Sequence, residues 1–204
     1  MGAIAHFQGL GGIAVLPKIK GMNIHQLSVS YDERQDRLLL RLNTQAGQEF
    51  RFWLTRRMTI RLLPAMDQSI VRLEAAQPGM AAADAPTQHM LTELKRNAFL
   101  QTADFSTPYS AEPQQLPLGD EPFLITDAHL TLQANGSLQI IFQKKMAGAT
   151  PSCQLTLQVT LVHGMIHLIR QCMANADWGL VAQSTEHRSE DAPETPLKAQ
   201  VYKH

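Results

Sequence analysis

The residues best suited to binding lie in one short run, Glu49-Phe-Arg-Phe-Trp-Leu-Thr-Arg-Arg57. Alternate side chains of a strand point to opposite faces of the sheet. One set in this run is apolar and is expected to face inward: Phe50, Phe52 and Leu54. The other set is expected to face outward: Arg51, Trp53 and, just past the strand, Arg57. Arginine beside an exposed aromatic ring suits phosphate contact with base stacking, or an acidic protein surface.

The preceding strand adds another arginine to this face. A turn over residues 44–48 places Arg41 directly opposite Arg51. The same register places Leu39 opposite Trp53. Two like charges in opposed positions of a sheet repel, and an anionic partner usually offsets the repulsion. We therefore predict a binding face made of five residues: Arg41, Arg51, Trp53, Arg57 and Leu39.

A structural role for the same residues is the alternative. Glu49 lies on the same face and is able to pair with either arginine. Residues 97–143 contain five acids and no Lys or Arg, so this stretch could fold over the arginines. Trp53 and Leu39 would then be core residues under the middle helix. The sequence leaves both roles open.

Two histidines, His163 and His167, have the i, i+4 spacing of metal-binding helices. The run between them lacks the Glu of the hydrolytic zinc motif, and zinc would need at least one more ligand. We therefore expect two surface histidines, and neither a metal nor a cofactor. Gly9-Leu-Gly-Gly12 lacks the preceding strand and the glycine spacing of a dinucleotide site. Because no catalytic motif is recognisable, a non-enzymatic protein is favoured.

Three alternating segments open the patterned part of the chain, at 24–31, 37–43 and 49–54. Period-2 alternation between turn-forming clusters indicates half-buried antiparallel strands, and two short turns in succession predict a meander. From Thr55, a suitable N-cap, apolar residues recur at helical spacing as far as Leu73. Pro64 lies inside this stretch and predicts either a kink or a helix that starts there.

The second half repeats this order after three connecting elements: a linker (76–86), a middle helix (87–101, capped by Thr87) and a Pro-rich acidic loop (104–122). Strands are predicted at 123–134, 138–145 and 153–162, and a helix at 163–176. Two loops are possible between the strands at 123–134 and 138–145: a two-residue Asn-Gly turn, or a three-residue loop at 135–137 with a bulge. The three-residue loop is favoured, because it pairs the apolar residues of the two strands on one face. Trp178 follows the last helix closely enough to pack back on the core.

These elements predict an α+β fold with two antiparallel three-stranded meanders, each followed by a helix, as a βββα pseudo-repeat. A unit of about 55 residues buries too little surface to be stable alone, so we expect both meanders to share one core. Two loosely coupled lobes are the alternative. The predicted organisation is a flexible leader (1–21), a single α+β domain (22–178) and a disordered tail (179–204). Within the domain, the two βββα units are 22–75 and 123–178.

Residues 35–57, QDRLLLRLNTQAGQEFRFWLTRR, resemble a segment of a family of uncharacterised proteobacterial proteins. The resemblance covers about the first third of the chain, from Met22 to near Ala75. It implies a bacterial cytoplasmic protein and favours Met22 over Met1 as the start. It implies no activity, cofactor or site residue.

Composition excludes several classes of protein. The chain has 204 residues, and at 44% apolar and 18% charged it is too apolar to be wholly disordered. Its 18 basic residues balance 18 acidic ones and the pI is about 7.1, which disfavours a dedicated nucleic-acid binder. Two cysteines exclude a disulfide scaffold, and no apolar run is long enough to span a bilayer.

We therefore expect a cytoplasmic binding or adaptor protein that engages an anionic partner through the outer face of the first meander. An acidic protein surface is the favoured partner, or a homo-oligomer that buries Trp53 and Leu39. Single-stranded nucleic acid is less favoured, and no membrane partner is expected. The alternative is an enzyme or small-ligand-binding protein with a pocket between the two units, lined by groups such as Tyr31, Asp127 and His129.

Overall fold

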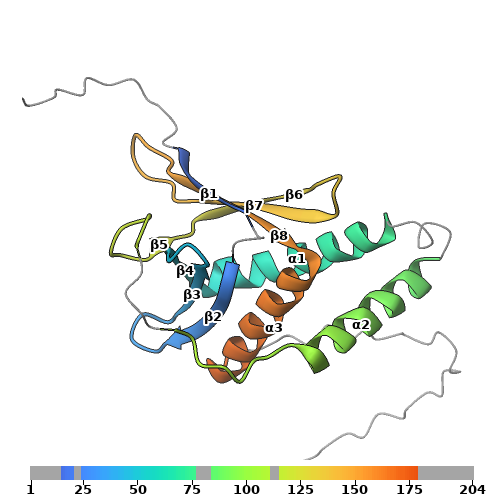
Figure 1. The fold of residues 1–204 in the computed structure, drawn as a ribbon. Coiled ribbons are helices and arrows are strands. Elements are labelled where there is room, and N and C mark those ends of the chain that lie inside the picture. The colour runs from blue at the N-terminus through green and yellow to red at the C-terminus, as the bar shows by residue number, and fades with distance from the viewer. Residues whose placement is uncertain (1–14, 21–23, 77–83, 111–114, 179–204) are drawn as a thin grey trace, which may run out of the picture.

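The computed structural model describes residues 15–20, 24–76, 84–110 and 115–178 (Figure 1). The predicted disordered tail, Met22 and most of the predicted leader lie outside the described residues. The first sheet has the strand order β2 (Ile24–Asp32), β3 (Arg37–Thr44), β4 (Glu49–Thr55) and β5 (Phe123–Leu124). The second has the order β1 (Val15–Lys20), β8 (Ser152–Gln158), β7 (Ser137–Gln143) and β6 (Asp127–Leu132).

The described helices are α1 (Arg56–Ala75), α2 (Ala85–Thr102) and α3 (Val159–Asn175). The fold is of the α+β class, as the sequence predicts. α1 begins at the predicted N-cap, because the Thr55 hydroxyl accepts a hydrogen bond from the Met58 N–H (3.2 Å). The helix continues through Pro64, so the proline neither starts nor ends it.

The first meander forms as predicted from β2, β3 and β4. Six inward-facing side chains of β3 and β4 are buried: Leu38, Leu40, Leu42, Phe50, Phe52 and Leu54. Arg41 pairs with Arg51, and Leu39 pairs with Trp53, which confirms the predicted register. A slip of one residue would turn every buried leucine of β3 toward the outer face, so the core fixes this register.

The predicted strand at 123–134 is wrong in one respect, because the structure divides it between the two sheets. β5 pairs in parallel with β4, whereas β6 pairs with β7. The chain crosses over where the Ile125 N–H donates to the Trp53 carbonyl (3.0 Å) and the Thr126 N–H donates to the Gln143 carbonyl (2.8 Å). The core-facing apolar residues lie at odd-numbered positions before this crossing (Phe123 and Ile125) and at even-numbered positions after it (Ala128 and Leu130).

The β6–β7 hairpin has a three-residue loop, but at 134–136 rather than at the predicted 135–137. The Gln133 N–H donates to the Ser137 carbonyl (2.9 Å), and Leu130 pairs with Ile140. The Asn135 side chain accepts bonds from the Ser137 N–H (3.2 Å) and hydroxyl (2.6 Å). This Asx interaction, with a positive φ of 76° at Gly136, sets the turn one residue earlier.

Two helices begin earlier than predicted. Asp84 caps α2 in place of Thr87, and its carboxylate accepts a bond from the Thr87 N–H (3.1 Å). α3 begins at Val159, so residues 159–162 are helical where a strand was predicted. β-Branched residues suit a strand, but the helix buries Val162 on the same stripe as Met165 and Ile166.

Residues 15–20 fall in the predicted flexible leader, and there the prediction is wrong because they form β1. β1 runs parallel to β8 at the edge of the second sheet. Its register shifts between Val15 and Lys18, around Pro17, which has no N–H to donate. The pairing depends on a partner more than a hundred residues later, which no local pattern reveals.

Each long helix packs on the sheet that it does not follow along the chain. α1 follows β4 of the first sheet and packs across β6 and β7, whereas α3 follows β8 and packs against β2 (Figure 1). α2 lies against α1 and α3. The buried apolar cluster contains residues of both sheets and both long helices, together with Trp178. The predicted packing of Trp178 on the core is therefore confirmed.

Candidate ligand-binding cleft

Arg41 and Arg51, the first two predicted site residues, lie together on the outer face of the first sheet. Arg41 Nε donates to Ser28 Oγ (3.2 Å), and its guanidinium lies 4.4 Å from the centre of the Tyr109 ring. Arg51 Nη2 donates to the Asp120 carbonyl (2.6 Å). The segment after α2 therefore does fold over the arginines, but with a ring and a carbonyl rather than acidic side chains.

Two buried polar atoms beneath this segment have no hydrogen-bond partner among the described residues: Arg51 Nε and the Tyr109 hydroxyl. Burial, helped by the Glu49 carboxylate, raises the pKa of Tyr109 above its usual value of 10. Tyr109 is therefore protonated at neutral pH. It covers Arg41 as a neutral ring and is not a counter-ion.

Leu39 and Trp53 lie side by side and are half-buried. Trp53 also pairs with Leu124 of β5. α2 packs on α1 and α3, so the neighbour of Trp53 is a strand rather than the middle helix. These two residues extend the outer face of the first sheet.

Arg57, the last predicted site residue, lies past the end of β4 in the first turn of α1. It is exposed and lines a hollow of about 280 Å³ together with Arg61. The structure thus brings four of the five predicted residues together on one sheet face and places Arg57 at a separate feature.

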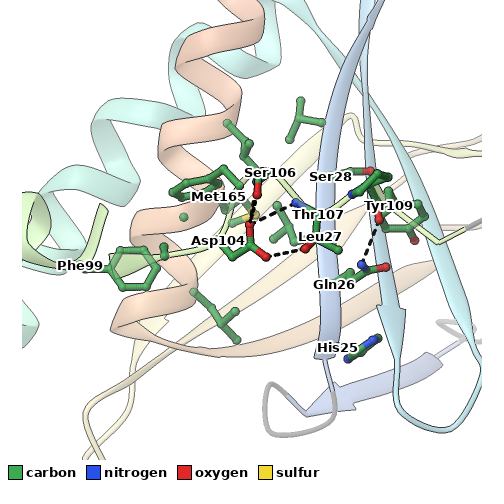
Figure 2. A pocket seen from close by; sticks show the side chains of 17 residues that line it. His25, Gln26, Leu27, Ser28, Phe99, Asp104, Ser106, Thr107, Tyr109 and Met165 are labelled. Atoms are coloured by element: carbon green, nitrogen blue, oxygen red, sulfur yellow. Dashed lines mark hydrogen bonds between the residues drawn. The ribbon is translucent and has the colours of Figure 1, made fainter. Parts of the chain in front are cut away.

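A larger cleft lies between β2 of the first half and α3 of the second half (Figure 2). The end of α2 and the segment 103–109 form its third side. Its volume is about 580 Å³. Small-molecule sites in proteins typically measure about 300–1,000 Å³, so the cleft has the size of such a site.

The α3 wall of the cleft contains Gly164, which lies between apolar lining residues on neighbouring turns: Leu161, Met165 and Leu168. Glycine inside a helix destabilises it by roughly 0.5–1 kcal/mol relative to alanine. A Cβ at this position would meet nothing closer than the Phe99 ring, at 3.8 Å, which is an ordinary contact. Packing therefore does not require glycine here, and the missing side chain leaves the wall of the cleft open.

Asp104 supplies one fixed negative charge to the cleft (Figure 2). Its Oδ1 accepts bonds from the Ser106 N–H (2.8 Å), the Ser106 hydroxyl (2.7 Å) and the Thr107 N–H (3.1 Å). Its Oδ2 accepts one bond, from the Thr107 hydroxyl. These bonds, that of the Thr107 hydroxyl foremost, hold the pKa of Asp104 far below its usual range. Oδ2 still has the capacity to accept a further bond from a ligand.

β2 borders the cleft as the terminal strand of its sheet. Among the described strands it pairs only with β3. The Cys172 thiol of α3 donates to the Val29 carbonyl (3.2 Å), so α3 closes the strand edge at that point. The stretch from His25 to Leu27 borders the cleft itself. An unpaired strand edge presents N–H and C=O groups that a ligand can use.

His163 lies behind the cleft wall, and the prediction of a surface position is wrong for it. It is 4% exposed, its Nε2 lies 3.7 Å from Glu74 Oε1, and its ring faces that of Phe99. α1 and α2 cover the helix face that the sequence pattern assigned to solvent. Burial lowers the pKa of His163, although Glu74 opposes the shift. In the described part of the chain, no group of three or more His, Cys, Asp or Glu could hold a metal ion.

The polar groups named for a pocket between the two units do not line this cleft. Tyr31 donates its hydroxyl to Asp36 Oδ1 (3.0 Å). Asp127 pairs with Lys145 (2.9 Å), and His129 Nε2 lies 3.1 Å from the Gln143 side-chain oxygen. Gly164 and Asp104 line the cleft but were not among the residues predicted from the sequence. The available signals were a glycine inside a helical pattern and an Asp followed by Ser and Thr two and three residues later.

The chain matches no family model, no curated protein and no solved structure. The resemblance of residues 35–57 to proteobacterial proteins therefore stays a prediction. None of the helices that the structure describes is long and apolar enough to cross a membrane.

Proposed function

We propose that this protein binds a small, largely apolar ligand in the cleft between β2 and α3. Gly164 is the observation that carries the proposal. It weakens α3, no neighbour requires it, and its missing side chain keeps open the wall of a cleft with the volume of a small-molecule site. A small-ligand-binding protein with a pocket between the two units was one of the alternative functions considered from the sequence.

The charge around the cleft indicates which ligands it favours. Asp104 is the one acid among the lining residues, and no Lys or Arg is among them. Because its carboxylate stays ionised, an anionic ligand is repelled, and a neutral or singly cationic one is favoured. A ligand amine or hydroxyl could donate to Asp104 Oδ2, with the apolar body against Leu27, Met165 and Leu168.

We also infer that the two βββα stretches are a pseudo-repeat with exchanged helices. Support comes from the shared order of elements and from α1 and α3, each of which packs on the opposite sheet. The cleft then lies where the two halves meet, between β2 and α3. We also propose that the protein is bacterial and cytoplasmic, because residues 35–57 resemble a segment of proteobacterial proteins.

The anionic partner of the first meander remains a second proposal. Arg41 and Arg51 already contact Tyr109 and the Asp120 carbonyl within the chain. Any partner on this face would therefore have to displace the segment that covers it. The ligand cleft needs no such rearrangement, which is why we favour it.

A fragment screen by saturation-transfer NMR tests the proposed function. We expect neutral and cationic apolar fragments to bind both the wild type and Gly164→Ala. They should not bind Gly164→Leu, because its larger side chain fills the space beside Phe99. Leu168→Phe blocks the cleft independently from the next turn of α3. Circular dichroism checks that each variant is folded. Fragments that bind the two blocked variants as well as the wild type would overturn the proposal, as would a screen without hits.

A further inference from the structure

α1 begins with three arginines in its first six residues, Arg56, Arg57 and Arg61, and no acid in its first turn. Arg56 has a structural role, because its Nη2 donates to the Trp178 carbonyl (3.2 Å). Arg57 and Arg61 are exposed, and they form no hydrogen bond or ion pair with any described residue. Within the part of the chain that the structure describes, these two cations therefore have no partner.

Their position is unfavourable for the helix by itself. The first turn of a helix carries a partial positive charge and is stabilised by acids, so Arg57 is unfavourable where it lies in α1. Residues four apart on a helix are neighbours, so the two guanidinium groups also repel each other. Such a local conflict without internal compensation is typical of a functional site.

The two arginines line one hollow of about 280 Å³ between α1 and the crossing from β5 to β6. Asp127 is the acid among its lining residues, and Lys145 Nζ already neutralises it across 2.9 Å. Thr126 also donates its hydroxyl to Asp127 (3.0 Å). The hollow therefore has a surplus of two positive charges, both carried by forked guanidinium groups.

We propose that this hollow is a binding site for a phosphate dianion, held by Arg57 and Arg61. Guanidinium groups form paired hydrogen bonds with phosphate oxygens, and two of them match two negative charges. A carboxylate has only one charge to offer. The volume leaves room beside the phosphate for part of an organic group, so a phosphomonoester fits as well as free phosphate. This site is separate from the β2–α3 cleft and does not depend on it.

Isothermal titration calorimetry of the full chain at low salt tests the proposal. Inorganic phosphate and phenyl phosphate are the two ligands, so the titrations distinguish a site for free phosphate from one for a phosphomonoester. Benzoate is the matched carboxylate. We expect Arg57→Gln/Arg61→Gln to weaken phosphate binding by about tenfold or more, since it removes both charge-assisted contacts. Arg57→Lys/Arg61→Lys keeps both charges but loses the forked guanidinium groups. Its affinity for phosphate should lie between that of the wild type and that of Arg57→Gln/Arg61→Gln.

Arg34→Gln/Arg72→Gln is the matched control, because it removes two exposed arginines from other places. It should leave binding within twofold of the wild type. Equal weakening in the two double-Gln variants would mean attraction by net charge alone and would overturn the site. Absence of wild-type binding at millimolar phosphate, or equal affinity for benzoate, would overturn it as well. Both arginines are exposed, so melting temperatures should stay close to that of the wild type.

Discussion

Trp178 donates its indole N–H to Asp36 Oδ1 across 2.6 Å, and this bond joins the residues after α3 to the turn between β2 and β3. Tyr31 donates to the same oxygen (3.0 Å), and its ring meets the Trp178 ring edge to face at 5.8 Å between centres. Asp36 takes a positive φ of 49°, which its short polar side chain tolerates. The end of the second half is thereby fixed to the first meander.

Replacing Trp178 should destabilise the protein strongly, because the side chain is 2% exposed. We expect Trp178→Ala to lower the free energy of unfolding by about 3–5 kcal/mol, as for other large buried aromatic residues. Trp178→Phe keeps a ring beside Tyr31 and should have a clearly smaller effect. Urea denaturation followed by circular dichroism measures both. Equal effects of the two substitutions would mean that the ring contributes little beyond its N–H.

His163 should make the protein less stable in weak acid. Burial lowers the pKa of His163 in the folded state below its usual 6.5. As pH falls below 6.5, the unfolded chain takes up a proton that the folded chain resists, so stability is full above that pH and is lost below it. Urea denaturation at about pH 7.5 and about pH 5.5 measures this loss.

The matched variant for this measurement is His163→Gln, which cannot titrate. It should show a smaller fall in stability between the two pH values, whatever its absolute stability. The other histidines of the chain are the same in both proteins, so the difference between the two pH slopes isolates the contribution of His163. An unchanged pH slope in the variant would assign the acid sensitivity to other groups.

Gly164→Ala should stabilise the protein. Alanine favours the helix over glycine by roughly 0.5–1 kcal/mol, and the added Cβ finds the Phe99 ring at an ordinary distance. Urea denaturation of the two proteins at one pH measures the difference. A loss of stability would mean that close packing requires the glycine, which would then no longer indicate an open wall.

The sequence predicted the local structure that depends on neighbours along the chain. The alternation in β3 and β4, joined by a short turn, was enough to place Arg41 opposite Arg51. Thr55 was identified as the cap of α1 because capping needs only the residue type and its position. The phase change of the alternation near Thr126 was visible in the sequence, but the division into β5 and β6 was not inferred from it.

The sequence could not predict which surfaces cover one another. Apolar periodicity shows that α3 buries one face, but not that α1 and α2 also bury His163. For the same reason the packing of α1 on β6 and β7, and of α3 on β2, was not foreseen. The cleft combines β2, Asp104 and Gly164, which are remote from one another in sequence and meet because α3 packs against β2. No local pattern contains such a site.

Ligand binding in the β2–α3 cleft is the central claim, and amide chemical-shift mapping of the labelled protein tests it most directly. Hexylamine and hexanoate are matched probes, because they share an apolar chain and differ in charge. We predict that hexylamine shifts the amides of residues 25–29, 103–109 and 161–168, and that hexanoate shifts them much less because the Asp104 carboxylate repels it. Shifts confined to other parts of the chain, equal shifts with both probes, or none at all would contradict the account.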